Sequence, residues 1–150
     1  MFALVPGTVA VAVPALMTRY RMRPALLGLG PLRLVGAAMI AAGAPLLVRS
    51  FVRFVRQGRG TPAPLAPPER LVASGPYRFV RNPMYEAVVA VAAGQGLLFG
   101  SVAVLVYAGV LVATFHLFVT LYEEPYLRSQ FGPDYEAYCQ RVGRWLPRRT

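Results

Sequence analysis

The sequence contains no lysine, one cysteine, one histidine and only six acidic residues. A single thiol, Cys139, excludes an intramolecular disulfide and a multi-cysteine metal site. A single imidazole, His116, excludes a site built on paired histidines, so we expect no bound metal. Charged residues make up 15% of the 150 residues, well below the roughly 25% of soluble domains. These shortages argue against an ordinary soluble domain.

Apolar residues, by contrast, make up 56% of the chain, and all 16 basic residues are arginine, which gives a net charge of +10. A large positive charge is also found in proteins that bind nucleic acid. Here, however, the arginines flank long apolar runs, an arrangement that fits anionic lipid headgroups better. We therefore expect the lipid bilayer as a partner and no nucleic acid.

Uncharged runs predict an all-α membrane protein with about four transmembrane helices in a single integral membrane domain, residues 1–150. Eighteen helical residues extend about 27 Å, close to the thickness of the hydrocarbon core. The second run is short, but arginines at both ends can snorkel outward. The run Ala87–Tyr122 would be about 54 Å long as one helix, so it must fold back as a hairpin at Phe99-Gly100-Ser101. The predicted spans are approximately 1–18, 34–48, 84–99 and 102–122.

The remaining segments are more polar. Arginines at positions 49, 53 and 56 recur at helical spacing, which predicts that the second helix continues into the headgroup layer. Residues 57–69 contain four prolines and two glycines and are expected to form a loop, either a linker or a lid over a site. Residues 123–150 are expected to form an amphipathic cytoplasmic tail that is interrupted at Gly132-Pro133.

Arginine counts predict the orientation of the chain. The connection 49–83 has seven arginines, the tail has five, the first connection has four and the hairpin turn has none. The positive-inside rule then places the 49–83 connection and the tail in the cytoplasm, although the four arginines of the first connection oppose this. We expect an integral protein of a bacterial inner membrane whose site faces the cytoplasm.

The segment Gly75–Tyr85 (GPYRFVRNPMY) is the densest polar and aromatic stretch, and it directly precedes the hairpin. Pro83 favours the first turn of a helix, whose free N–H groups can bind a carboxylate. Arg81 can bind a carboxylate with two hydrogen bonds, and Asn82 offers a donor and an acceptor. The alternative is a helix start with interfacial anchors and no ligand. Aromatic faces for a sulfonium cation or an adenine come from Tyr77 and Tyr85.

Two adjacent carboxylates, Glu123 and Glu124, end the last predicted span. Carboxylates at a helix C-terminus oppose the helix macrodipole, so a cationic or hydroxyl group is expected to compensate for them. Two alternatives stay open, because the pair can instead cap a tail helix that begins at Pro125 or form ion pairs with nearby arginines.

Glu86 lies one turn inside the third predicted span, on the same face as Asn82. Ionisable groups within spans are candidates for function, and the alternative here is an ion pair with Arg78 or Arg81. Gln95 and His116 are expected to have structural roles through hydrogen bonds between helices, and Cys139 is expected to be an inert thiol.

The order GPYRFVRNPMY, helical hairpin, EEPYL, FGPDYEAY and LPR extends over about residues 74–148. This combination resembles the isoprenylcysteine carboxyl methyltransferase and phospholipid methyltransferase superfamily, whose members are small helical membrane enzymes that use S-adenosylmethionine. The resemblance implies a methyltransferase that uses this cofactor and acts on a lipophilic acceptor, prenylated or lipid-like, at the membrane. The first two predicted spans do not contribute to it.

By position, the resemblance implies that the catalytic residues are Arg81, Glu123 and Glu124. The family commonly has Arg-His-Pro where this chain has Arg81-Asn82-Pro83, so the chain lacks a group there that titrates near neutral pH. Carboxyl methylation of the isoprenylcysteine type is therefore preferred, because a carboxylate is already ionised whereas an amine must first lose a proton. The alternatives are a phospholipid or amine N-methyltransferase and a non-enzymatic membrane scaffold or accessory subunit. The implied cofactor-binding residues are Tyr77, Arg81, Asn82, Pro83, Tyr85, Glu123, Glu124, Tyr135 and Tyr138.

Overall fold

The structure is a computed structural model that describes residues 4–58 and 70–148. Within these ranges the chain is helical, and the only extended pairing is an isolated bridge between Val80 and Gly143. The predicted all-α class is therefore confirmed. The loop predicted at 57–69 lies, from residue 59 onward, outside the described residues.

The first predicted span is helical but is not a uniform α-helix. It consists of α1 (Leu4–Gly7), a π-helical segment (Thr8–Ala12) and α2 (Val13–Thr18). Pro14 lies in the first turn of α2, where the missing N–H is least costly. Helix α2 ends where Arg19 adopts the left-handed conformation, with φ 48°, a common way for a helix to terminate. A short 3₁₀ turn, Leu26–Gly28, follows.

The next three helices follow the predicted pattern. Helix α3 (Pro31–Gly58) is continuous over 28 residues and includes the second predicted span and the arginine repeat after it. Helices α4 (Pro83–Phe99) and α5 (Val102–Phe118) form the predicted hairpin. Gly100 turns the chain between them with φ 68°, and a Cβ at this position would clash with the carbonyl oxygen of Pro24. Only glycine fits this turn without strain.

The helix does not end at the predicted boundary between the last span and the tail. A π-helical segment (Val119–Glu123) joins α5 to α6 (Glu124–Arg141), and both glutamates have helical φ and ψ angles. Since Pro125 cannot donate the usual helical hydrogen bond, we attribute the continuity to the wider π-helical turn before it. The glutamates therefore lie at no free helix end, and neither the macrodipole nor capping explains them. The predicted interruption is confirmed, because Gly132 is non-helical (φ 49°, ψ −124°).

Contacts divide the described chain into two compact units, which we describe separately. Unit 1 consists of residues 4–45 and 85–113. Unit 2 consists of residues 46–58, 70–84 and 114–148. Helices α3, α4 and α5 each contribute residues to both units.

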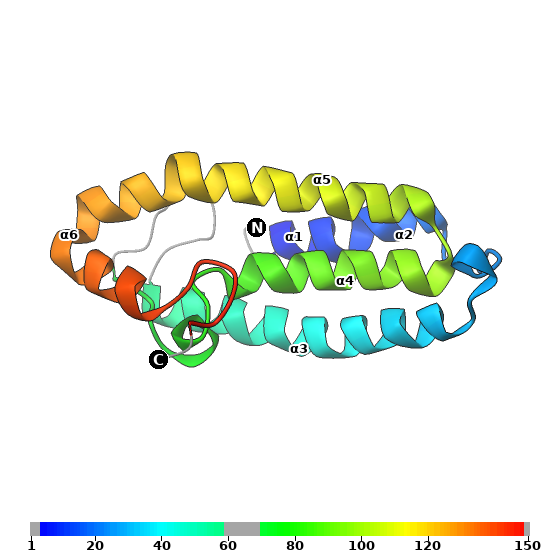
Figure 1. Ribbon diagram of the computed structural model, residues 1–150, viewed down its shortest axis with the longest axis horizontal. Coiled ribbons are helices and arrows are strands. Elements are labelled where there is room, and N and C mark those ends of the chain that lie inside the picture. Colours follow the sequence, from blue (N-terminus) through cyan, green and yellow to red (C-terminus); the bar gives the residue numbers. More distant parts are fainter. Residues whose placement is uncertain (1–3, 59–69, 149–150) are drawn as a thin grey trace. The chain divides into compact units, whose positions relative to one another are not determined.

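In unit 1, α3 and α4 lie side by side (Figure 1) and approach closely at glycines. A Cβ added to Gly94 would lie 2.7 Å from the carbonyl oxygen of Gly36, which is the close backbone packing that small residues allow between membrane helices. The Gln95 amide donates a hydrogen bond to the carbonyl of Ala10 (2.6 Å). This bond confirms the structural role predicted for Gln95.

In unit 2, a small core lies where α6 meets the segment after residue 70. Its buried members are Tyr135, Tyr138 and Val142. Leu71, Leu127, Phe131 and Cys139 pack against them. This core supports one side of the pocket described below.

Two helices of the described chain, Pro31–Gln57 and Val102–Arg141, are long and apolar enough to cross a membrane, as judged by length and composition. Thr8–Thr18 and Pro83–Phe99 are shorter apolar helices. Helix α4 has 17 residues, slightly fewer than the roughly 20 that a span usually needs, and it would extend about 26 Å. The count of four spans and the cytoplasmic position of the tail stay predictions.

Candidate functional site

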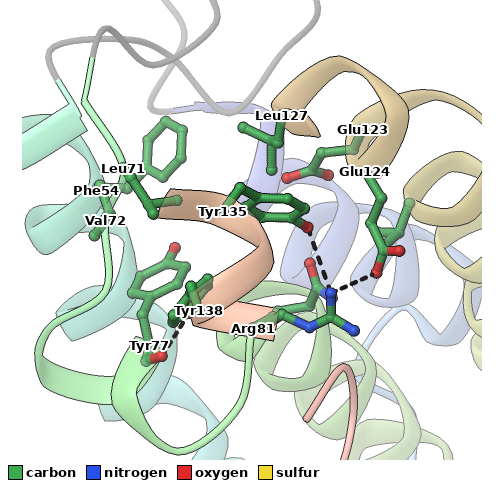
Figure 2. A pocket seen from close by; sticks show the side chains of 12 residues that line it. Phe54, Leu71, Val72, Tyr77, Arg81, Glu123, Glu124, Leu127, Tyr135 and Tyr138 are labelled. Atoms are coloured by element: carbon green, nitrogen blue, oxygen red, sulfur yellow. Dashed lines mark hydrogen bonds and ion pairs between the residues drawn. The ribbon is translucent and has the colours of Figure 1, made fainter. Parts of the chain in front are cut away.

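Unit 2 contains a pocket to which both predicted site segments contribute (Figure 2). Seven of the predicted site residues line it: Tyr77, Arg81, Asn82, Glu123, Glu124, Tyr135 and Tyr138. The fold thus brings the segment before α4 together with the two glutamates and with the tyrosines of α6. The sequence pattern did not point to the other lining residues, which are Phe54, Leu71, Val72, Val119 and Leu127.

The centre of the polar wall is the Glu124 carboxylate, which is only 2% exposed. Arg144 donates two hydrogen bonds to it, from Nε to Oε1 (2.6 Å) and from Nη2 to Oε2 (2.9 Å). Arg81 Nη1 lies 3.1 Å from Oε1, and Arg128 Nη2 lies 3.5 Å from Oε2. Three guanidiniums therefore surround one buried carboxylate. The alternative that this glutamate forms ion pairs with arginines is confirmed, and little of its accepting capacity is left for a ligand.

Arg81 has a different position in the network, because it also lines the pocket. Its side chain is 10% exposed, and its Nη1 donates to Cys139 Sγ (2.7 Å) and to the hydroxyl of Tyr135 (3.5 Å). The Nε atom is buried without a hydrogen-bond partner. A buried donor left unpaired is costly, so a ligand acceptor that reaches this N–H group would be bound favourably.

The outer arginines complete the charge balance. Arg128 pairs with Glu136 on the surface of α6, with 2.8 Å between Nε and Oε1. The hydrogen bonds to Glu124 raise the pKa of the Arg144 guanidinium, which therefore stays charged under all ordinary conditions. The guanidiniums of Arg81, Arg128 and Arg144 are therefore matched by the carboxylates of Glu123, Glu124 and Glu136.

The opposite wall is aromatic. Tyr77, in the 3₁₀ turn Gly75–Arg78, is buried and packs near Phe54 with ring centroids 6.5 Å apart. The Tyr138 hydroxyl donates to the carbonyl of Tyr77 (2.6 Å). Burial raises the pKa of the Tyr77 phenol, so this side chain is neutral and offers an uncharged ring face. Such faces attract cations, including sulfonium and ammonium groups.

A model of the family described as phospholipid methyltransferase matches residues 32–134, more than half of the chain. The chain belongs to the phospholipid methyltransferase family. This confirms the resemblance to the superfamily of integral membrane methyltransferases and indicates a membrane methyltransferase. No curated protein and no solved structure matches the chain.

Phospholipid methyltransferases in general use S-adenosylmethionine, and the pocket has suitable groups for the amino-acid end of this cofactor. The unpaired Nε of Arg81 suits a carboxylate, and Glu123, in the same wall, suits an ammonium. The pocket is partly open, and its cavity volume is about 40 Å³, room for roughly three water molecules at about 10–15 Å³ each. This space matches one charged end of a cofactor.

Two predicted residues do not line this pocket. Pro83 is fully buried at the first position of α4, the helix start that was predicted for it. Tyr85 is half-buried and is not among the lining residues. Glu86, the further candidate, also does not line it. Its Oε1 is buried without a hydrogen-bond partner, and the ion pairs of the described residues do not include Glu86 with Arg78 or Arg81.

Two residues at the site were not predicted from the sequence. Arg144 was not among the candidates and Cys139 was expected to have no role in the chemistry, whereas both contact the network around Glu124 and Arg81. The signal that could have found Arg144 is the Val-Gly-Arg segment directly after α6, because a charged residue beside a turn glycine can fold back onto its own helix. Cys139 offered no such signal beyond its helical spacing of four from Tyr135.

Proposed function

We propose that this phospholipid methyltransferase family member uses S-adenosylmethionine to methylate a lipophilic acceptor at the membrane, with the unit 2 pocket as its cofactor site. The observation that carries the proposal is the buried, unpaired Nε of Arg81 in a pocket that also contains Glu123 and three tyrosines. Such a pocket combines a donor for a carboxylate, an acceptor for an ammonium and ring faces for a sulfonium.

The residues have distinct roles in this proposal. Arg81 binds the cofactor carboxylate, and Glu124 holds the Arg81 guanidinium in place. Because three arginines already occupy Glu124, we assign the ammonium to Glu123. When bound, S-adenosylmethionine supplies an electrophilic methyl group on a positively charged sulfur. The aromatic wall then favours that charge and keeps water away from it.

A carboxylate is the first candidate acceptor, as in the isoprenylcysteine carboxyl methyltransferases. A carboxylate oxygen needs no base before it reacts, which agrees with the absence of a titratable side chain at Asn82. The pocket therefore needs only to orient this acceptor.

A phospholipid amine is the second candidate, because the matched family is described by phospholipid methylation. An ammonium headgroup must lose a proton before its nitrogen can react. An amine acceptor therefore requires a base in addition to Glu123, whose carboxylate binds the cofactor ammonium. The two candidates thus differ in their need for a base.

The test is methyl transfer from labelled S-adenosylmethionine by purified protein in vesicles, with a prenylated cysteine analogue or phosphatidylethanolamine as acceptor. Label released by mild base as methanol identifies a carboxyl ester, and label that stays on the lipid nitrogen identifies N-methylation. Arg81→Ala should abolish transfer, and Arg141→Ala, which removes an exposed arginine outside the network, should not. Transfer to neither acceptor, by protein that is folded, contradicts the proposal and favours a scaffold or accessory role.

We further propose that the chain is an integral protein of a bacterial inner membrane and that the pocket faces the cytoplasm. Two apolar helices of sufficient length support membrane insertion, and the arginine distribution supports the orientation. A Cys139→Ala background with a new cysteine at exposed Arg148 or exposed Val102 tests it with a membrane-impermeant thiol reagent. Labelling of Arg148→Cys in intact spheroplasts would contradict the orientation.

A further inference from the structure

The residues directly after α6 fold back onto the site. We call Val142–Leu146 the C-terminal clasp. The backbone N–H of Arg81 donates to the carbonyl of Gly143 (2.8 Å), and the Asn82 amide donates to the carbonyl of Arg144 (3.2 Å). The clasp therefore pairs with the segment that carries the predicted cofactor-binding residues.

The side chain of Arg144 extends from this clasp to Glu124. Its Nε shares Oε1 with Arg81 Nη1, and its contact is the shorter one, at 2.6 Å against 3.1 Å. Its Nη2 also takes Oε2, at 2.9 Å, where the contact of Arg128 is 3.5 Å. Arg144 thus satisfies both carboxylate oxygens itself. Arg81 is left with one longer contact to the carboxylate and an unpaired Nε.

We propose that Arg144 is a positioning residue for cofactor binding. Because Arg144 donates hydrogen bonds to both oxygens of Glu124, this carboxylate cannot form two hydrogen bonds with the Arg81 guanidinium. Arg81 can then bind an anion in the pocket. Its backbone fixes Asn82 at the same time. This inference rests on the proposed function, since it concerns the same site, but it assigns a role to the clasp and to a residue outside the pocket lining.

The fluorescence of Trp145 can be used to follow the position of the clasp. Trp145, the only tryptophan of the chain, donates its indole N–H to Nδ1 of His116, the only histidine, over 3.2 Å. The emission of Trp145 therefore shows whether the clasp lies against α5, and His116→Ala identifies the part of the signal that comes from this contact. This measurement does not depend on cofactor or activity.

The glycine of the clasp gives a backbone test. A Cβ on Gly143 would overlap the carbonyl oxygen of Leu146, a main-chain atom that cannot move aside easily. Gly143→Ala should therefore displace the clasp without removing any side chain of the site. It should change the emission of Trp145 and weaken cofactor binding together.

The decisive experiment compares binding of S-adenosylhomocysteine, measured by titration calorimetry, in folded protein and in variants at Arg144. Arg144→Ala should weaken binding by at least roughly tenfold. Loss of one partner of a buried charge pair leaves the Glu124 carboxylate to bind more of the Arg81 guanidinium. Arg144→Lys keeps the charge but loses the two-bond geometry, so its affinity should lie between those of the parent and Arg144→Ala. Arg148→Ala removes an exposed guanidinium that donates to the carbonyl of Gln140, and this variant should bind within about twofold of the parent.

The outcomes separate this inference from the function on which it rests. Equal affinity of the parent, Arg144→Ala and Arg144→Lys would overturn the positioning role and leave the cofactor site intact. No binding by the folded parent would overturn the proposed function and this inference with it. If Arg144→Ala does not fold, Arg144→Lys and Gly143→Ala decide the question, and unchanged affinity in both, with altered Trp145 emission in Gly143→Ala, would also overturn the inference.

Discussion

The hydroxyl of Tyr138 donates a hydrogen bond to the backbone carbonyl of Tyr77 over 2.6 Å, and both residues are buried. This bond fastens α6 to the 3₁₀ turn that precedes Arg81. The position of the aromatic wall therefore depends in part on a side chain 61 residues further along the sequence. The pocket is therefore built by tertiary contacts rather than by one local motif.

Tyr138→Phe should lower the free energy of unfolding by about 1–3 kcal/mol, because a buried carbonyl loses its donor. The measurement is unfolding in detergent, followed by circular dichroism. Tyr122→Phe is the control, since Tyr122 is 48% exposed and should change stability by less than about 0.5 kcal/mol. Equal effects of the two substitutions would contradict the role of the Tyr138 bond.

Much of the fold could be predicted because local chemistry determines it. Pro83 starts α4, Gly100 turns the hairpin and Gly132 interrupts α6, each through its own backbone preferences. The continuity of the helix through Glu123 and Glu124 could not be predicted in this way. It depends on a π-helical segment before Pro125, and the sequence carries no simple pattern for such a segment.

Alkaline pH should destabilise the protein through Tyr77. Burial raises the pKa of this phenol in the folded state, whereas in the unfolded chain it ionises near pH 10. The contribution of Tyr77 is therefore complete below about pH 10 and is lost as the pH rises above it, because the unfolded state releases a proton that the folded state keeps. The free energy of unfolding should fall more steeply above pH 10 in the parent than in Tyr77→Phe. Parallel curves for the two proteins would contradict this prediction.

Asn82→Asp should weaken the connection between the site and the clasp. The amide of Asn82 is buried and donates to the carbonyl of Arg144, but an ionised carboxylate can only accept. We expect a loss of about 1–3 kcal/mol in the free energy of unfolding. Gln140→Glu adds the same charge at an exposed position of α6, and it should be nearly neutral. A loss of equal size in Gln140→Glu would show that charge, rather than the lost donor, is responsible.

Gly94→Ala should disturb the contact between α3 and α4 in unit 1. The added Cβ would lie 2.7 Å from the carbonyl oxygen of Gly36 and 2.8 Å from Ile40 Cγ1, so we expect a loss of about 1–3 kcal/mol. Gly109→Ala is the matched control, because no atom lies within 4 Å of its added Cβ and alanine favours a helix. Thermal unfolding of both variants in detergent measures the difference. Greater loss in Gly109→Ala would contradict the close packing.

The residues that line the candidate site were largely predictable from the sequence, whereas the hydrogen bonds and ion pairs between them were not. The motif residues Arg81, Glu123 and Glu124 line one pocket, as the resemblance implied. Their partners could not be derived from spacing, since Arg144 contacts Glu124 across 20 residues and Cys139 contacts Arg81 across 58. Such contacts depend on how α6 and the clasp fold back, which short motifs do not encode.

The central claim is that the unit 2 pocket binds S-adenosylmethionine through Arg81. The most direct test is calorimetric titration of folded, detergent-purified protein with S-adenosylhomocysteine, beside Arg81→Ala and Arg141→Ala. The account predicts saturable binding by the parent and by Arg141→Ala, and a loss of roughly a hundredfold or more in Arg81→Ala. Undiminished binding by Arg81→Ala, or no binding by the parent, would contradict it.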